Sequence, residues 1–142
     1  MKVLITGGAG YLGTVLTEEI LNRFPYAKVI VYDNLMYKQD GLFSFFKYPK
    51  DRFEFVYGDV RDKNSLLEQL KKLDKDNDYV IPLAAIVGFP ACARDEKLAT
   101  AVNFEHVKYI VQSTKCRIIY PNTNSGYGVS DGEAHCTEET PL

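Results

Sequence analysis

The 142-residue chain has few of the side chains that build metal centres and disulfide frameworks. It carries three cysteines, Cys92, Cys116 and Cys136, and two histidines, His106 and His135. An odd number of widely spaced cysteines argues against a disulfide framework and indicates reduced thiols in the cytoplasm. No zinc-ligand spacing links the histidines to the cysteines, and we expect His106 to lie on the surface of a helix. The composition therefore argues against a fold built around a metal or disulfides.

The chain also lacks an excess of charge of one sign and a long apolar run. Its 17 basic and 19 acidic side chains are interspersed and give a formal net charge of −2 at pH 7. That balance gives no electrostatic reason to expect nucleic acid or an anionic membrane surface as a partner. No apolar stretch approaches the roughly 20 residues of a membrane span, and the apolar segment at the N-terminus is too short for a signal peptide. An apolar fraction of 46% and a charged fraction of 25% are those of one soluble globular domain.

A strand pattern runs directly into four glycines at the start of the chain. Residues 2–6 read Lys-Val-Leu-Ile-Thr, the glycines are Gly7, Gly8, Gly10 and Gly13, and a helical pattern follows. The spacing fits G-x-G-x-x-G on the last three glycines, or G-x-x-G-x-x-G when Gly7 takes the place of Gly8. A strand, a tight turn and a helix start present unpaired backbone N–H groups to an anion. The motif predicts a pyrophosphate cradle, although a glycine-rich turn without a ligand has the same composition.

The positions within this cradle have separate expected roles. We expect the phosphates to lie over Gly10, Tyr11 and Leu12, because Gly10 has no side chain to keep them from the backbone. The absence of a side chain at Gly13 would let the helix pack closely on the strand. A phosphate loop of the nucleoside-triphosphatase type is excluded, because its motif needs Lys after the last glycine and Thr14 stands there.

An acidic residue ends the second strand pattern, which covers residues 28–33. Asp33 lies 20 residues beyond Gly13, where a dinucleotide-binding fold places an acid that accepts hydrogen bonds from the adenosine ribose. A carboxylate there repels a 2′-phosphate, which favours NAD over NADP, and the nearby Lys38 weakens that preference. The alternative is a solvated acid at the end of a strand.

Strand and helix patterns alternate along the chain without an internal repeat. We expect strands near residues 2–6, 28–32, 53–57, 79–83 and 117–120, and helices near 14–24, 65–73 and 99–113. An aromatic-rich stretch, residues 34–51, is expected to form a short helix and loop. The alternation predicts right-handed crossovers and a parallel sheet in the order 3-2-1-4-5. The fold class is therefore α/β, a Rossmann-like doubly wound sheet.

Further candidate residues follow the strands, at the edge where open α/β sheets bind ligands. After the third strand, Asp59 is placed to accept from the adenine amino group beside Val60, and Asp62 is more simply a helix N-cap. Small side chains after the fourth strand would let a cofactor lie against the backbone: Leu83, Ala84 and Ala85. Residues 120–128, after the fifth strand, are rich in hydroxyl and amide groups and also fit an ordinary polar loop.

Together these residues resemble the extended short-chain dehydrogenase/reductase family, specifically its nucleotide-sugar epimerases and dehydratases. The matches occur in family order and cover essentially the whole chain: residues 6–13, 33–35, 58–60 and 83–85, Asn103, and residues 123–128. The resemblance implies a tightly bound NAD that transiently takes a hydride from a nucleotide sugar. It implies that Asn34 and Asn103 contact the cofactor, Asn103 on the nicotinamide side. Thr123 would be the catalytic Ser/Thr that hydrogen-bonds the sugar hydroxyl or keto oxygen.

One family motif is missing from the sequence. Family members carry a catalytic Tyr-x-x-x-Lys after the segment that matches 123–128, and none of the ten tyrosines here is followed by Lys at the fourth place. We therefore expect residues 1–142 to be the NAD-binding N-terminal part of such an enzyme, inactive without the later strands and the C-terminal substrate domain. Homodimerisation or self-association through the exposed fifth strand is expected. The alternative is a non-catalytic dinucleotide-binding sensor or interaction module.

Overall fold

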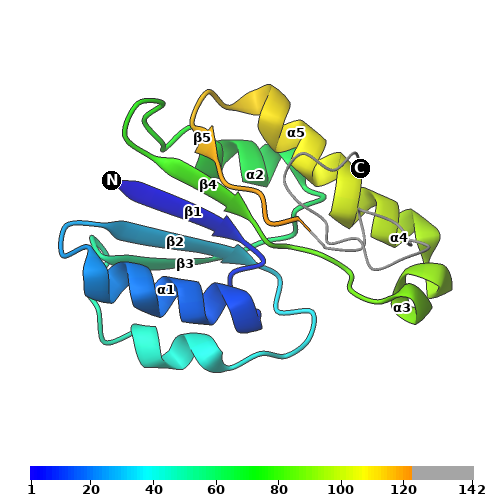
Figure 1. The fold of residues 1–142 in the computed structure, drawn as a ribbon, viewed down its shortest axis with the longest axis horizontal. Helices are drawn as coiled ribbons and strands as arrows, with labels where there is room; N and C mark the ends of the chain where they lie inside the picture. Colours follow the sequence, from blue (N-terminus) through cyan, green and yellow to red (C-terminus); the bar gives the residue numbers. More distant parts are fainter. Residues whose placement is uncertain (123–142) are drawn as a thin grey trace, which may run out of the picture.

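The computed structural model describes residues 1–122, which form a parallel β-sheet with helices on both faces (Figure 1). The spatial order is β3-β2-β1-β4-β5, and each neighbouring pair is parallel. The strands are β1 (Lys2–Thr6), β2 (Lys28–Asp33), β3 (Phe53–Tyr57), β4 (Tyr79–Pro82) and β5 (Arg117–Ile118). This order confirms the predicted Rossmann-like fold, with β1 at the centre and the fifth strand at an edge.

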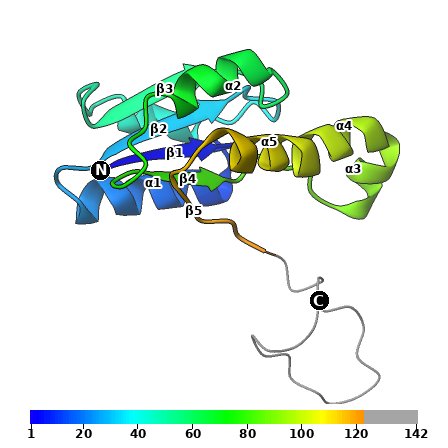
Figure 2. The same cartoon turned by 90° about the horizontal axis from the view of Figure 1, so that it is seen from above.

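The helices cover the two faces of the sheet in separate layers (Figure 2). On one face lie α1 (Tyr11–Arg23) and the short 3-10 helix η1 (Gly41–Phe45). On the other face lie α2 (Lys63–Leu70) and α5 (His106–Ser113). Two short helices, α3 (Phe89–Arg94) and α4 (Glu96–Thr100), extend past the carboxyl ends of the strands, where Figures 1 and 2 both place them.

The sequence of the central strand explains the two layers. Successive side chains of a strand point to opposite faces, so Val3 and Ile5 pack with Leu21 of α1 while Leu4 packs with Leu66 of α2. These aliphatic side chains are all buried. A parallel sheet covered on both faces needs apolar residues at every central position, which accounts for the continuous apolar runs in β1 and β2.

The helix predicted for residues 99–113 is present and contains one π-helical turn. The structure has α4, then a π-helical turn η2 (Ala101–Glu105), then α5. The sequence does not predict the preceding helix α3, because its six residues are too few to display a helical period. Among residues 1–122, no helix is long and apolar enough to cross a membrane.

The prediction that His106 lies on the helix surface is wrong. Its side chain is 2% exposed and packs toward the sheet. One ring nitrogen, Nδ1, contacts the carbonyl oxygen of Val102, and Nε2 lies 3.4 Å from the Thr6 hydroxyl at the end of β1. Burial lowers the pKa of the imidazole from its ordinary value of 6.5. His106 is thus a neutral core residue that links α5 to the central strand.

Candidate functional site

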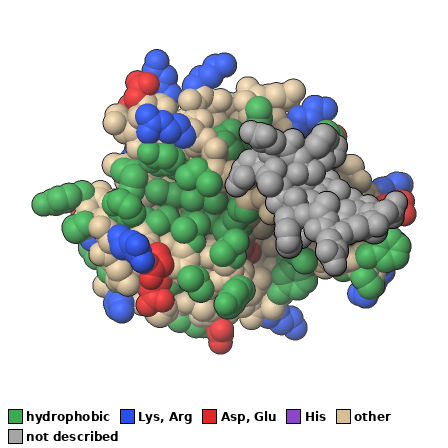
Figure 3. All heavy atoms as spheres, in the orientation of Figure 1, with side chains coloured by type: hydrophobic (Ala, Val, Ile, Leu, Met, Phe, Trp, Pro, Cys, Tyr) green, Lys and Arg blue, Asp and Glu red, His purple; other side chains and the backbone are tan. Residues whose placement is uncertain are grey.

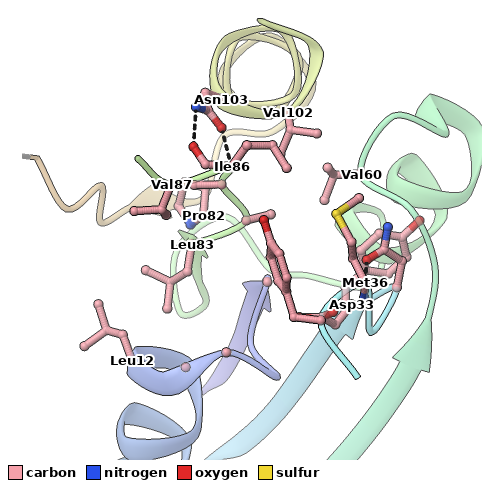
Figure 4. A pocket seen from close by; sticks show the side chains of 18 of the residues that line it. Leu12, Asp33, Met36, Val60, Pro82, Leu83, Ile86, Val87, Val102 and Asn103 are labelled. Atoms are coloured by element: carbon pink, nitrogen blue, oxygen red, sulfur yellow. Dashed lines mark hydrogen bonds between the residues drawn. The ribbon is translucent and has the colours of Figure 1, made fainter. Parts of the chain in front are cut away.

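A pocket of about 730 Å³ lies at the carboxyl ends of the strands, beside the glycine-rich turn. The structure places all of the predicted cofactor-binding residues around it: Gly7, Gly10, Tyr11, Leu12, Gly13, Asp33, Asn34, Asp59, Val60, Leu83, Ala84, Ala85 and Asn103. Figure 4 shows Leu12 on one side of the pocket, Met36 and Val60 on another, and Asn103 above it. Thr123, the predicted catalytic residue, lies outside the described residues.

The glycine turn connects β1 to α1 along one wall of the pocket. Gly7 has a φ of +70°, and a Cβ at this position would lie 2.4 Å from the backbone nitrogen of Ala84. A Cβ at Gly13 would lie 2.5 Å from the Cα of Gly8, so the first turn of α1 packs directly on the loop. Glycine at positions 7 and 13 therefore lets the turn after β1, the segment after β4 and the first turn of α1 meet without side chains between them.

The N-terminus of α1 has no side-chain cap among the described residues. Gly10 occupies the N-cap position, and no acidic residue lies in the first turn. The backbone N–H of Thr14 donates to the Gly10 carbonyl over 2.9 Å, which closes the first helical turn. The N–H groups before it have no acceptor within the helix and lie at the positive end of the helix dipole. This end of the pocket can therefore hold an anion.

Asp33 joins the end of β2 to the glycine turn. Its Oδ2 accepts from the backbone N–H of Ala9 over 3.0 Å, and its Oδ1 accepts from that of Leu35 over 2.7 Å. The residue is 7% exposed, and each carboxylate oxygen retains capacity for another donor. Lys38, which the sequence places close to Asp33, is not among the described residues that line the pocket. The predicted competing cation therefore lies outside the pocket wall.

Two residues after β2 line the pocket although the sequence did not single them out. Met36 and Gln39 lie in the segment between β2 and η1. The Oε1 atom of Gln39 is buried and has no hydrogen-bond partner in the described part of the chain. A buried acceptor without a donor favours a ligand that brings hydroxyl or amino groups. Sequence reasoning missed Gln39 because a polar residue in an irregular loop has no spacing signal.

The residues after β3 combine a rigid carboxylate with a helix cap. Asp59 accepts hydrogen bonds from Arg61 and from Asn34, and the Arg61 side chain is the main reason that the pKa of this carboxyl is lowered to about 2. Asp62 accepts from the backbone N–H groups of Asn64 and Ser65, both over 3.1 Å, which confirms it as the N-cap of α2. Asp59 is therefore ionised across the physiological range.

Asn103 holds the wall of the pocket that follows β4. Its Oδ1 accepts from the backbone N–H of Ile86 over 2.8 Å, and its Nδ2 donates to the Ile86 carbonyl over 3.0 Å (Figure 4). The thiol of Cys92 in α3 donates to the same carbonyl over 3.3 Å. These contacts satisfy the backbone of a segment that has no strand partner in the described sheet. Asn103 thus positions residues 83–87 rather than lying freely in the pocket.

The pocket has the features that a dinucleotide requires. An uncapped helix N-terminus can hold the pyrophosphate, and partly unsatisfied acceptors at Asp33 and Gln39 can hold hydroxyl groups. Apolar side chains and small residues form the remaining walls, and the volume is within the range of small-molecule sites. Within residues 1–122, no group of three or more His, Cys, Asp or Glu could hold a metal ion. The fold and the site together define a dinucleotide-binding α/β domain.

Comparison with known proteins gives the family. Residues 3–142 match the NAD dependent epimerase/dehydratase family, and because the match covers nearly the whole chain, this chain belongs to that family. A CDP-paratose 2-epimerase of Salmonella typhi is 31% identical over 133 residues, which are 90% of this chain and 38% of the Salmonella protein. The family assignment made from the sequence motifs is confirmed, as is NAD as the cofactor of the family.

Solved structures support the same assignment. The dTDP-glucose 4,6-dehydratase DesIV of Streptomyces venezuelae, solved with NAD, is 27% identical with a TM-score of 0.84, covering 100% of this chain and 45% of that one. The UDP-glucose 4-epimerase of Thermus thermophilus, also solved with NAD, is 27% identical with a TM-score of 0.63, over 80% of this chain and 33% of that one. The chain thus spans less than half the length of these relatives.

Proposed function

We propose that this chain forms the NAD-binding part of a nucleotide-sugar epimerase or dehydratase. The observation that carries the proposal is the pocket lined jointly by an uncapped helix N-terminus, the Asp33 carboxylate and the Asn103-held segment after β4. The family of the chain and the NAD found in solved relatives support it. The nucleotide sugars named for these relatives make that class the expected substrate.

Each part of the pocket has a proposed share in binding the cofactor. The pyrophosphate would lie over Gly10, Tyr11 and Leu12 and accept from the backbone N–H groups of Tyr11 and Leu12, since the N–H of Gly10 donates to the Gly7 carbonyl. The carboxylate of Asp33 would accept from the hydroxyl groups of the adenosine ribose, and Asn34 and Gln39 line the same pocket. The base would lie near Asp59 and Val60. The nicotinamide half would lie against the small side chains of residues 83–85, on the side of Asn103.

In the proposed hydride transfer, the residues of this chain would position the cofactor and the sugar. When bound, NAD would supply a hydride acceptor for one carbon of the sugar, and the hydride would be returned in the same turnover. Ile86 and Val102, both buried, form an apolar wall on the side expected for the nicotinamide. We propose that Thr123 hydrogen-bonds the sugar hydroxyl or keto oxygen. We place the protein in the cytoplasm, supported by the free thiols of Cys92 and Cys116.

We further propose that residues 1–142 alone do not turn over a nucleotide sugar. They contain no Tyr-x-x-x-Lys, the pair that supplies the general base in the family. Loss of a general base costs about a hundredfold to ten-thousandfold in rate. We also propose that the chain self-associates. The edge strand β5 supports this, as do the apolar side chains that Figure 3 shows gathered over β1 and β4.

Isothermal titration of the 142-residue chain with NAD and with NADP tests the proposal. We expect NAD to bind, and to bind more tightly than NADP, because of the Asp33 carboxylate. A chain that binds neither dinucleotide, or that prefers NADP, would contradict the proposed function. The same preparation, supplied with NAD and CDP- or dTDP-sugars, is expected to show no turnover. Measurable turnover would contradict the proposal that these residues are inactive by themselves.

A further inference from the structure

The helical segment that carries Asn103 departs from regular α-helical hydrogen bonding directly before His106. The backbone N–H of His106 donates to the carbonyl oxygen of Ala101, five residues earlier, whereas a regular α-helix would pair it with Val102, four residues earlier. The imidazole Nδ1 of His106 contacts the Val102 carbonyl oxygen instead. A side-chain donor therefore lies where a regular helix would place the backbone donor of the same residue.

The partners of the imidazole fix its tautomer and its orientation. A carbonyl oxygen can only accept, so the proton of the neutral ring lies on Nδ1, and Nε2 is an acceptor. The Thr6 hydroxyl lies 3.4 Å from Nε2 and can donate to it. Both side chains are buried, and burial lowers the pKa of the imidazole, which favours its neutral form. The ring is thus held between the end of β1 and the π turn.

The π turn supplies part of the pocket wall. Val102 and Asn103 both line the pocket, and Figure 4 shows them on the helix above it. The Asn103 amide pairs with the backbone N–H and the carbonyl of Ile86 over 2.8 and 3.0 Å. A regular α-helical pairing would change the register by one residue and rotate Asn103 about the helix axis, relative to α5, by roughly 100°. The contact between Asn103 and Ile86 therefore depends on the π turn.

We propose that His106 is a positioning residue for the nicotinamide half of the cofactor. Its imidazole holds the π turn, and the π turn holds the Asn103 amide on the backbone of Ile86. This inference rests on the proposed binding of NAD. His106 is not among the described residues that line the pocket, so it acts through the Val102 carbonyl, while Thr6 sets the direction of the ring.

Two amide substitutions separate the roles of the two ring nitrogens. In His106→Asn, the side-chain Nδ2 can replace Nδ1 as the donor to the Val102 carbonyl. In His106→Gln, the amide lies farther from the backbone, near the position of Nε2, and leaves that carbonyl without its side-chain donor. A role in positioning requires that the asparagine variant retains the function and that the glutamine variant loses it.

Titration calorimetry with NAD and with ADP-ribose, which lacks the nicotinamide, measures the effect on the proposed subsite. We expect the wild type to bind NAD about tenfold or more tightly than ADP-ribose. His106→Asn should keep most of this advantage. His106→Gln should reduce it by about fivefold, the worth of one neutral hydrogen bond, and should leave the affinity for ADP-ribose close to that of the wild type.

Hydrogen exchange of the Ile86 amide gives a readout that needs no cofactor. This N–H donates to Asn103, so its exchange relative to the amides of β1 should accelerate in His106→Gln and stay near the wild-type rate in His106→Asn. Ile110→Val is the control for lost stability, because Ile110 is buried on α5 and its shortening removes no donor from the π turn. It should change neither the NAD advantage nor the relative exchange rate.

Three results would overturn the proposal. The first is a wild type that binds NAD and ADP-ribose equally well. The second is a His106→Gln variant that is folded by circular dichroism and keeps the full NAD advantage. The third is the same loss in His106→Asn, His106→Gln and Ile110→Val, which would assign His106 a purely structural role. A wild type that binds neither ligand would instead refute the proposed function, and the exchange of the Ile86 amide would still decide whether His106 positions Asn103.

Discussion

Replacing Asp33 by asparagine tests how the pocket distinguishes its cofactor. The substitution keeps the size of the side chain and one acceptor oxygen but removes the negative charge. In the structure, the two carboxylate oxygens accept from the backbone of Ala9 and of Leu35 and keep further accepting capacity. In the Asp33→Asn variant, one of these N–H groups would face an amide nitrogen instead of an acceptor. We therefore expect effects on both cofactor binding and stability.

The Asp33→Asn substitution should change the affinity for each dinucleotide and, separately, the stability of the fold. Hydrogen bonds to a charged group are each worth about 1.5–3 kcal/mol, so NAD should bind about tenfold to hundredfold more weakly. Affinity for NADP should hold or rise, because the repulsion between the carboxylate and the 2′-phosphate disappears and an amide donor is gained. One backbone donor without an acceptor costs about 1–3 kcal/mol, which lowers the melting temperature by several degrees.

Titration calorimetry with both dinucleotides, together with a thermal melt, measures these effects. The expected signature is a ratio of NADP to NAD dissociation constants that shrinks by at least about tenfold. Asp40→Asn is the matched control, since Asp40 is an exposed carboxylate in the same segment and does not line the pocket among the described residues. An equal loss of affinity for both cofactors would refute the reasoning, because it would assign Asp33 a purely structural role.

Three further outcomes are expected from single substitutions. Gly13→Ala places a Cβ 2.5 Å from the Gly8 backbone and should lower both the melting temperature and the affinity for NAD. At Gly10 the atom nearest to an added Cβ would be 3.3 Å away. Gly10→Ala should therefore melt near the wild-type temperature and bind NAD more weakly. Because burial lowers the pKa of His106 below 6.5, the unfolded state binds the proton more readily. Denaturant melts should therefore show a free energy of unfolding that falls as pH drops below about 6.5, and a flatter pH profile in His106→Gln. Ile119 is 52% exposed and follows β5 directly, so we expect it to contribute to concentration-dependent association. Sedimentation of Ile119→Lys should shift toward the monomer, and unchanged association would contradict a role for this edge.

The sheet could be predicted from the sequence because each strand combines a short apolar run with a clear break. The limits of β1 and β3 agree with the expected 2–6 and 53–57. At the edge, β5 is shorter than the expected 117–120, since a strand with one neighbour has pairing on one side alone. Helix α1 begins at Tyr11 rather than residue 14, because the glycine motif at its start hides the helical period. Such limits depend on tertiary contacts that the sequence does not display.

The candidate site, like the fold, could be predicted from the sequence only in part. Spacing along the chain was enough to place Asp33 and the glycines around the pocket, because the strand, turn and helix order fixes where those residues lie. It could not reveal which groups donate to the Asp59 carboxylate, since Arg61 follows the same strand while Asn34 follows β2. That the Gln39 Oε1 atom has no partner among residues 1–122 depends likewise on how the loop after β2 packs. Hydrogen-bond capacity is a property of the folded neighbourhood.

The π turn shows how a local irregularity connects the core to the pocket. Ala99, Val102, His106 and Ile110 are buried at helical spacing, so a polar side chain in the middle of this apolar stripe was the available signal that His106 belongs to the core. The neighbouring Asn103 is partly buried and bonds the backbone of Ile86, which belongs to the same buried cluster as the stripe. Asn103 lies within the π turn over residues 101–105, and His106 follows it directly. The pocket wall after β4 and the buried imidazole are thus held by the same segment, so a substitution that restores a regular helix there would change the site through Asn103.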